Sequence, residues 1–185
     1  NTGIGYHALE NHTTGINNVA VGTFAGDELT TGGSNTALGS GALSAATTTN
    51  HNTAVGAGAL SATTGQNNTA VGSTTLDANT TGSNLTAVGY GALGSNTSGS
   101  NSVAIGSGCL TSNTTGNLNV AIGNSNLNAN TTGIRLTSVG HAALMNNTTA
   151  NDNTAVGYHA LQSNTTGSAN TAVGDRALDS NTTAN

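Results

Sequence analysis

Few side chains in this sequence could do chemistry, and their spacing forms no catalytic or metal-binding constellation. The histidines are His7, His12, His51, His141 and His159. A metal site needs several ligands that converge with fixed geometry, and the acidic residues keep no repeated register with the histidines. His7 and His159 do stand at equivalent places, two residues after a glycine, but glycine, phenylalanine, threonine, serine, alanine or arginine fills that place elsewhere. We therefore interpret the histidines as exposed residues without a function, and we expect no metal site.

The single cysteine, Cys109, replaces alanine in "GSGCL". A nucleophilic cysteine needs a base and an orienting partner, and no histidine lies in the same repeat or in either adjacent one. We interpret Cys109 as a small buried side chain, with a cross-link between copies of the chain as the less favoured alternative. With no candidate constellation anywhere, we expect no catalytic residue, no cofactor and no enzyme activity.

The feature that must position every side chain is a repeat. The glycine that ends each "AVG"-like triplet, called here the anchor glycine, recurs every 17 residues, with one step of 16. The anchor glycines are Gly5, Gly22, Gly39, Gly56, Gly72, Gly89, Gly106, Gly123, Gly140, Gly157 and Gly174. No linker interrupts them, so residues 1–185 form one repeat array, which we interpret as a fragment of a longer fibre.

Composition excludes several classes of protein. Charged residues make up 5% and aromatic residues 2% of the chain, and the net charge is −5. Arg135 and Arg176 are the only basic residues, whereas nucleic-acid binding needs clustered lysine and arginine. No apolar run is long enough to span a bilayer, and we identify no signal peptide or membrane anchor in this segment.

The segment "NTAVG" predicts a short β-strand, because β-branched residues alternate and turn residues surround it. A leucine four residues after the anchor glycine and an aliphatic residue directly before it recur in nearly every repeat. We expect both columns to stack from coil to coil as the core. Representative predicted core residues are Val21, Val55, Val71, Val88, Ile105, Ile122, Leu43, Leu60, Leu93 and Leu110.

The residue between the two outer strand positions is alanine in most repeats. Side chains alternate between faces along a strand, so Ala54 points away from Thr53 and Val55. A column restricted to small residues indicates close packing, and we predict that it contacts another copy of the chain. The proposed subunit interface contains Ala37, Ala54, Ala70, Ala87, Ala104 and Ala121. The expected assembly is a parallel homotrimer in register.

The polar columns favour the same all-β architecture, a parallel β-solenoid (β-roll) of about eleven 17-residue coils. Asparagine opens the strand in most repeats, as at Asn18, Asn35 and Asn52, and stacked amides can hydrogen-bond from coil to coil. The recurring "NTTG" block suits a turn. It is either a turn or a short second strand followed by a turn, and the sequence does not decide between these.

The motifs "NSVAIG" at 101–106, "NVAIG" at 119–123 and "NTAVG" elsewhere resemble the YadA-like head repeats of trimeric autotransporter adhesins. They are also similar to repeat shafts of phage tail fibres and related bacterial surface fibres. The resemblance covers the whole chain and implies a left-handed β-roll with three parallel chains around one axis. The repeat of 17 residues is a few residues longer than the usual adhesin head repeat.

These observations predict an extracellular structural and adhesive fibre segment, located on a cell surface or a virion appendage. Its expected partners are other copies of itself and a host or cell surface, without nucleic acid or membrane insertion. The alternative is a solenoid that binds ice or another crystal surface through columns of threonine. Those columns comprise Thr13, Thr30, Thr47, Thr63, Thr80, Thr97, Thr114, Thr131, Thr148, Thr165, Thr182 and the residue after each.

Overall fold

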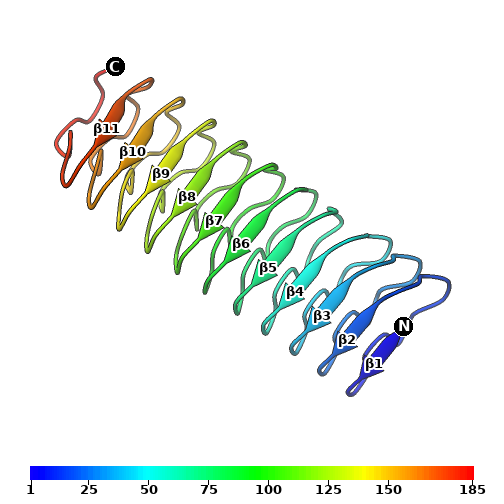
Figure 1. The fold of residues 1–185 in the computed structure, drawn as a ribbon. Helices are drawn as coiled ribbons and strands as arrows, with labels where there is room; N and C mark the ends of the chain where they lie inside the picture. The colour runs from blue at the N-terminus through cyan, green and yellow to red at the C-terminus, as the bar shows by residue number, and fades with distance from the viewer.

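The computed structural model describes all 185 residues, and its regular secondary structure consists of short strands alone. The strands are β1 (Thr2–Ile4), β2 (Val19–Val21), β3 (Thr36–Leu38), β4 (Thr53–Val55), β5 (Thr69–Val71), β6 (Thr86–Val88), β7 (Val103–Ile105), β8 (Val120–Ile122), β9 (Thr137–Val139), β10 (Thr154–Val156) and β11 (Thr171–Val173). They form one sheet in chain order, and the termini lie at opposite ends of an elongated rod (Figure 1). The all-β solenoid predicted from the repeat is confirmed.

Strand pairing follows the sequence period. Thr36 pairs with Thr53 in a parallel arrangement, and Thr53 pairs with Thr69 across the one shorter step. The ladder continues outside the strands, since 98 of the 118 backbone–backbone hydrogen bonds lie beyond them. Each coil is therefore bonded to the next one around much of its circumference and not through the sheet alone.

The "NTTG" block is a bend, and each coil has a single strand. In the block at 113–116, the amides of Thr114 and Thr115 both donate to the carbonyl of Thr131 in the next coil, over 2.9 and 3.3 Å. The two hydrogen bonds continue the ladder without strand geometry. Of the two alternatives that the sequence left open, the structure has the turn.

Two columns of asparagine stack along the rod. In the column that opens the strands, the amide of Asn52 donates to Oδ1 of Asn35 over 3.0 Å, so the predicted coil-to-coil bonding is confirmed. In the column that opens the "NTTG" block, Nδ2 of Asn113 donates to Oδ1 of Asn96 and to the carbonyl of Gly116, over 2.9 and 3.1 Å. Because these buried amides must be satisfied, each one fixes the position of its coil against its neighbours.

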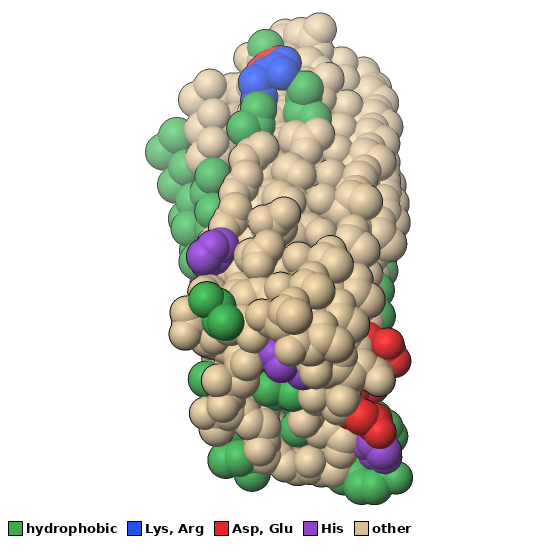
Figure 2. Space-filling model, turned by 90° about the vertical axis from the view of Figure 1, so that its right-hand side faces the viewer, with side chains coloured by type: hydrophobic (Ala, Val, Ile, Leu, Met, Phe, Trp, Pro, Cys, Tyr) green, Lys and Arg blue, Asp and Glu red, His purple; other side chains and the backbone are tan.

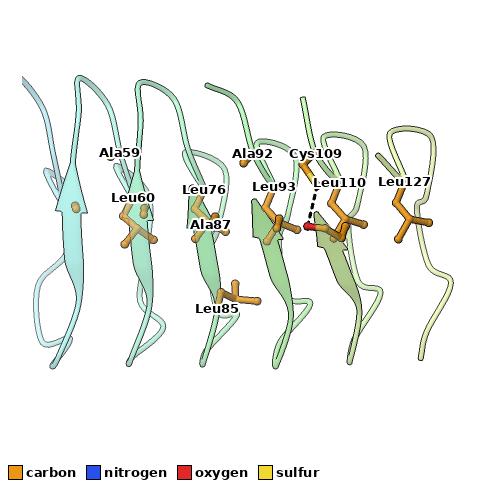
Figure 3. Close-up of a cluster of buried hydrophobic side chains, with 14 of the residues drawn as sticks. Ala59, Leu60, Leu76, Leu85, Ala87, Ala92, Leu93, Cys109, Leu110 and Leu127 are labelled. Carbon is orange, nitrogen blue, oxygen red and sulfur yellow. Dashed lines mark hydrogen bonds between the residues drawn. The ribbon is translucent and has the colours of Figure 1, made fainter. Parts of the chain in front are cut away.

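The leucine column forms the core, as predicted. Leu43, Leu60, Leu93 and Leu110 are fully buried, and the leucines of successive coils lie in a row inside the solenoid (Figure 3). The matching prediction for the aliphatic column before the anchor glycine is wrong. Val21, Val55 and Val88 are only half-buried, and Val71, Ile105 and Ile122 are 36–38% exposed, on the outside of the sheet.

The alanine column lies inside the chain, which overturns its assignment as a subunit interface. Within one chain, Ala37 is 2% exposed, and Ala54, Ala70, Ala87, Ala104 and Ala121 are completely buried. The alternation of side chains was predicted correctly, but the inner and outer faces were exchanged. The three-residue strand turns its middle residue inward and its two flanking residues outward.

The physical reason for alanine is the thinness of the coil. A Cβ atom built on Gly3, which takes the alanine place in β1, would lie 3.1 Å from the carbonyl oxygen of Ala8 on the opposite wall. A methyl group therefore already fills the gap between the sheet and the turn that faces it. A larger side chain would overpack the interior, so valine and isoleucine can stand only on the outer face.

The core leucines have an unusual backbone. Leu43 has φ = 56° and Leu93 has φ = 52°, in the left-handed region that a bulky residue seldom adopts. The surrounding structure compensates, because both side chains are fully buried and each amide bonds to the next coil. The turn after the strand is thus stabilised by its packing and its ladder, against the local preference of leucine.

The rod has one seam, where the coil between Gly56 and Gly72 is one residue short. In the preceding coil the amides of Thr30, Thr31 and Gly32 all donate to the carbonyl of Thr47. The amides of the next block, at 47–49, have no hydrogen-bond partner in the chain, and the buried hydroxyl of Thr49 has none either. The missing residue therefore interrupts the ladder on this side of the rod.

We predict that the amides at 47–49 exchange with solvent at least about tenfold faster than those of Thr97, Ser98 and Gly99, which all bond to Thr114. Inserting one threonine after Thr63 should restore the period and slow exchange at 47–49. Amide-resolved hydrogen exchange measures both effects. Equal exchange at the two blocks would show that the shortened coil leaves no weak point.

Candidate functional site

The side chains with chemical potential are dispersed over the rod. No group of three or more histidine, cysteine, aspartate or glutamate residues could hold a metal ion, and the surface has no pocket. His7 contacts Glu10, and His12 bonds to the carbonyl oxygens of Gly15 and Leu29. No helix is long and apolar enough to cross a lipid bilayer. The features with functional potential are therefore extended surfaces.

One ion pair joins neighbouring coils. Nε and Nη2 of Arg135 donate to the two carboxylate oxygens of Asp152, over 2.6 and 2.9 Å. These hydrogen bonds lower the pKa of Asp152 below its ordinary value of 3.8 and raise the pKa of Arg135. Both side chains are about half exposed, and exposed pairs stabilise proteins little. The pair links two successive coils, as the amide contacts of the asparagine columns do, and it does not form a binding site.

Cys109 is completely buried in the core, as the sequence predicted for a small side chain. Its Sγ atom donates to the carbonyl oxygen of Ala121 over 3.2 Å (Figure 3). Burial raises the pKa of the thiol from 9.0 to about 12, against a smaller lowering by a backbone hydrogen bond. The thiol is therefore protonated and shielded at neutral pH, which disfavours both a nucleophilic role and a cross-link.

The first extended surface is the outer side of the sheet, called here the sheet face. It consists of the first and third residue of each strand and contains only threonine, valine, isoleucine and leucine. Hydrophobic side chains gather along the left margin of Figure 2, which is the side turned to the viewer in Figure 1. Much of the remaining surface in that view is polar and uncharged. The sheet face is thus a charge-free strip that runs the length of the rod.

Threonine hydroxyls differ between the two sides of the rod. In the first threonine column of the "NTTG" edge, Thr97 Oγ1 donates to the carbonyl of Thr114 over 3.1 Å, and Thr114 Oγ1 donates to that of Thr131 over 3.1 Å. On the sheet face, by contrast, the hydroxyls of Thr53, Thr86 and Thr154 make no hydrogen bond within the chain. Free threonine hydroxyls on the sheet face therefore form one column, at the first strand position, and valine interrupts it at Val19, Val103 and Val120.

The second surface is an edge that sequence reasoning missed. All three tyrosines and the one phenylalanine stand one or two residues after an anchor glycine, together with three histidines. We call this set the aromatic edge: Tyr6, His7, Phe24, Tyr90, His141, Tyr158 and His159. Comparing the two positions after every anchor glycine would have found it, although glycine, serine and alanine fill most other coils there.

No protein-family model, curated protein or solved structure matches this chain. The two surfaces and the repeat itself are therefore the features from which a function can be inferred. The sheet face offers a flat, uncharged array to a large partner. The aromatic edge offers a few rings at separate points along the rod.

The buried thiol gives a test of the packing. We predict that Cys109 does not react with a thiol reagent at pH 8 in the native protein and reacts at once in denaturant. The folded-state pKa is raised, so the stability linked to this thiol is complete below pH 9 and declines between pH 9 and 12, by up to about 1.4 kcal/mol per pH unit.

The matched variant is Cys109→Ala, because alanine fills this place in most coils, as at Ala92 and Ala143. Its free energy of unfolding should fall less than that of the parent protein as the pH rises from 9 to 12. Denaturant titrations of both proteins over this range measure the difference. Rapid labelling of native Cys109, or identical pH dependence in the two proteins, would contradict the buried placement.

Proposed function

We propose that this chain is a segment of an extracellular structural and adhesive fibre, and that three copies pack in parallel through their sheet faces. The observation that carries the proposal is the outward column of aliphatic residues directly before the anchor glycines. Val71, Ile105 and Ile122 keep more than a third of their surface exposed although equivalent residues stack in every coil. Large continuous apolar surfaces typically mark interaction sites.

The sheet face has the chemistry of an interface core. It contains no charged residue over the whole rod, and charged residues are depleted at the centres of protein interfaces. Ten coil steps at about 4.8 Å make the strip about 48 Å long. A surface of this length and uniformity suits an equally long and uniform partner, and another copy of the same rod meets both conditions.

The register of the sheet favours parallel copies. Strands pair directly with their neighbours from β1 to β11, without a bulge or a crossover. Copies related by rotation about an axis along the rod would therefore place like residues at like heights in every coil. A closed rotational assembly satisfies all copies at once. The number three and the left-handed coil are implied by the resemblance to YadA-like repeats and stay predictions.

The energy of such an interface would come from repetition. A fully buried valine or isoleucine gains about 1.5–3 kcal/mol, and these side chains have already lost more than half of their exposure within one chain. Each coil can therefore add only a fraction of that value. A short array would associate weakly, whereas a long array would associate strongly, which is the behaviour expected of a fibre shaft.

The free hydroxyls of the sheet face support a second candidate, the binding of ice or another crystal surface. Thr53 and Val55 lie on the same side of a strand, with equivalent residues in the adjacent coils. The array repeats about every 4.8 Å along the rod and about every 6.7 Å along the strand. This candidate gains the threonine column of the sheet face, and on the "NTTG" edge it keeps the second column, as at Thr81 and Thr115, because only the hydroxyls of the first column are bonded to carbonyls. It requires the face to stay uncovered.

We predict that the 185-residue chain has three times its monomer mass of 17.8 kDa in solution. Val88→Lys combined with Ile105→Lys should yield a folded monomer, because two lysines per chain would place like charges against one another in the assembly. Ser95→Lys combined with Asn146→Lys, at exposed places outside the sheet face, is the control and should stay trimeric. Light scattering and circular dichroism measure mass and folding.

A parent protein that is monomeric at every concentration would contradict the proposal, as would a trimer that tolerates the two sheet-face lysines. Thermal hysteresis by a monomeric parent, lost in Val88→Lys combined with Ile105→Lys, would favour the crystal-surface candidate. A monomer without hysteresis would remove both candidates for the sheet face.

A further inference from the structure

The aromatic edge carries the only large rings of a chain that is otherwise poor in them. Tyr6 and Tyr90 are 66% and 67% exposed, and Phe24 and Tyr158 are 43% and 46% exposed. Single exposed aromatic residues need no explanation. Here, however, every tyrosine and phenylalanine of the chain falls in two adjacent columns out of seventeen. The rings therefore mark one side of the rod.

Near the C-terminal end of the rod, three rings form a stack. The centroids of Tyr158 and His159 are 3.8 Å apart with an interplanar angle of 12°, and His141 of the preceding coil lies 5.5 Å from Tyr158 at 20°. His141 and His159 are 5.6 Å apart at 21°. Because the three rings lie nearly parallel, they form a stacked cluster, called here the C-terminal platform, that spans two coils.

A second cluster lies near the N-terminal end. Tyr6 and His7 meet edge to face, with centroids 3.7 Å apart, and the ring of His7 stacks on Phe24 at 5.2 Å and 3°. Tyr90 stands between the two clusters, five coils after Tyr6 and four coils before Tyr158. At about 4.8 Å per coil these intervals are about 24 and 19 Å. The edge thus presents three separate aromatic contacts along one line.

Polar groups of the edge are available to a ligand. The hydroxyls of Tyr6, Tyr90 and Tyr158 make no hydrogen bond within the chain, nor do the ring nitrogens of His141 and His159. A tyrosine combines an apolar ring with a polar tip, which is why tyrosine is enriched at binding surfaces. The edge can therefore combine ring stacking with hydrogen bonding.

The same geometry disfavours other partners. A peptide that added itself as a strand would need free carbonyls as well as free amides, but the carbonyls of Tyr6, His141 and Tyr158 already accept amides from the next coil, over 2.9, 3.0 and 2.8 Å. An anionic polymer would need a basic cluster, and the edge has only Arg176 nearby. A compact small molecule would need a pocket, and the surface has none.

We propose that the aromatic edge binds an uncharged, extended polysaccharide, with C–H faces of its sugars stacked on the rings and its hydroxyls bonded to tyrosine and histidine. This inference rests on the proposed fibre function, for which it supplies the adhesive surface. Each aromatic contact alone contributes little binding energy. Three contacts on one rigid rod act together on one polymer, so the effective concentration at the second and third contacts is high.

Affinity gel electrophoresis with hydroxyethylcellulose, mannan or dextran tests the proposal, and alginate serves as a charged comparison. The variant combines His141→Ser, Tyr158→Ser and His159→Gly, which removes the C-terminal platform. Serine and glycine occupy these columns in other coils, as at Ser107 and Gly108, so the fold should be kept. The control combines Thr149→Ser and Thr166→Ser, at exposed residues of the "NTTG" edge.

The parent protein should be retarded by at least one neutral polysaccharide, with the dissociation constant raised about tenfold in the triple variant and unchanged in the control. Absence of retardation by all three neutral polymers would overturn the proposal, as would equal binding by the triple variant or retardation by alginate alone. Light scattering on the same samples reports assembly separately. If the protein is a monomer and still binds polysaccharide through the platform, the trimer proposal is wrong and this inference holds.

Discussion

Every ladder in this molecule depends on one constraint, that the chain returns to the same place after 17 residues. When it does, the strand, the bends and both asparagine columns all bond to the next coil, as Asn113 does to Asn96. When one residue is missing, as between Gly56 and Gly72, the amides at 47–49 lose their partners. Because hydrogen bonds outside the strands outnumber those within them, the coil length matters more for this fold than strand propensity does.

The same constraint makes the interior narrow and the exterior free. Within a thin coil, only alanine fits behind the sheet and leucine fills the space beyond it, so Ala87 and Leu93 are both fully buried. Outward positions carry no such restriction, and each of them becomes a line of residues along the rod. Each surface of this protein therefore consists of columns of equivalent residues from successive coils. The sheet face is a column of uniform residues suited to a uniform partner, whereas the aromatic edge varies from coil to coil and can carry separate contacts.

The sequence predicted much of this architecture and misassigned one part of it. Regular repetition is sufficient to infer the parallel register, the strand at "NTAVG", the leucine core and the stacking of Asn35 on Asn18, but not whether the "NTTG" block adds a second strand. Alternation separates Ala54 from Thr53 and Val55, but it does not say which set points inward. That choice depends on the width of the coil, which is set by the turn opposite, including the left-handed backbone of leucines such as Leu60. Hydrophobicity alone favours valine at the inward position, but the volume available inside the coil admits only small residues such as alanine. The aromatic edge was missed because its residues occur in few coils, so the repeat pattern gives them no weight.

The central claim is that successive coils stack directly along the whole rod, residue i on residue i+17, or on i+16 across the shortened coil. Distances between pairs of spin labels test it in a Cys109→Ala background, with labels at Ala45 and Asn146 or at Ala45 and Ser180, all exposed and at equivalent places six and eight coils apart. Dilution with unlabelled chain removes distances between copies. The account predicts narrow distributions near about 29 Å and about 38 Å, which increase by about 4.8 Å per coil. Broad distributions, or separations that do not grow in proportion to the number of coils, would contradict it.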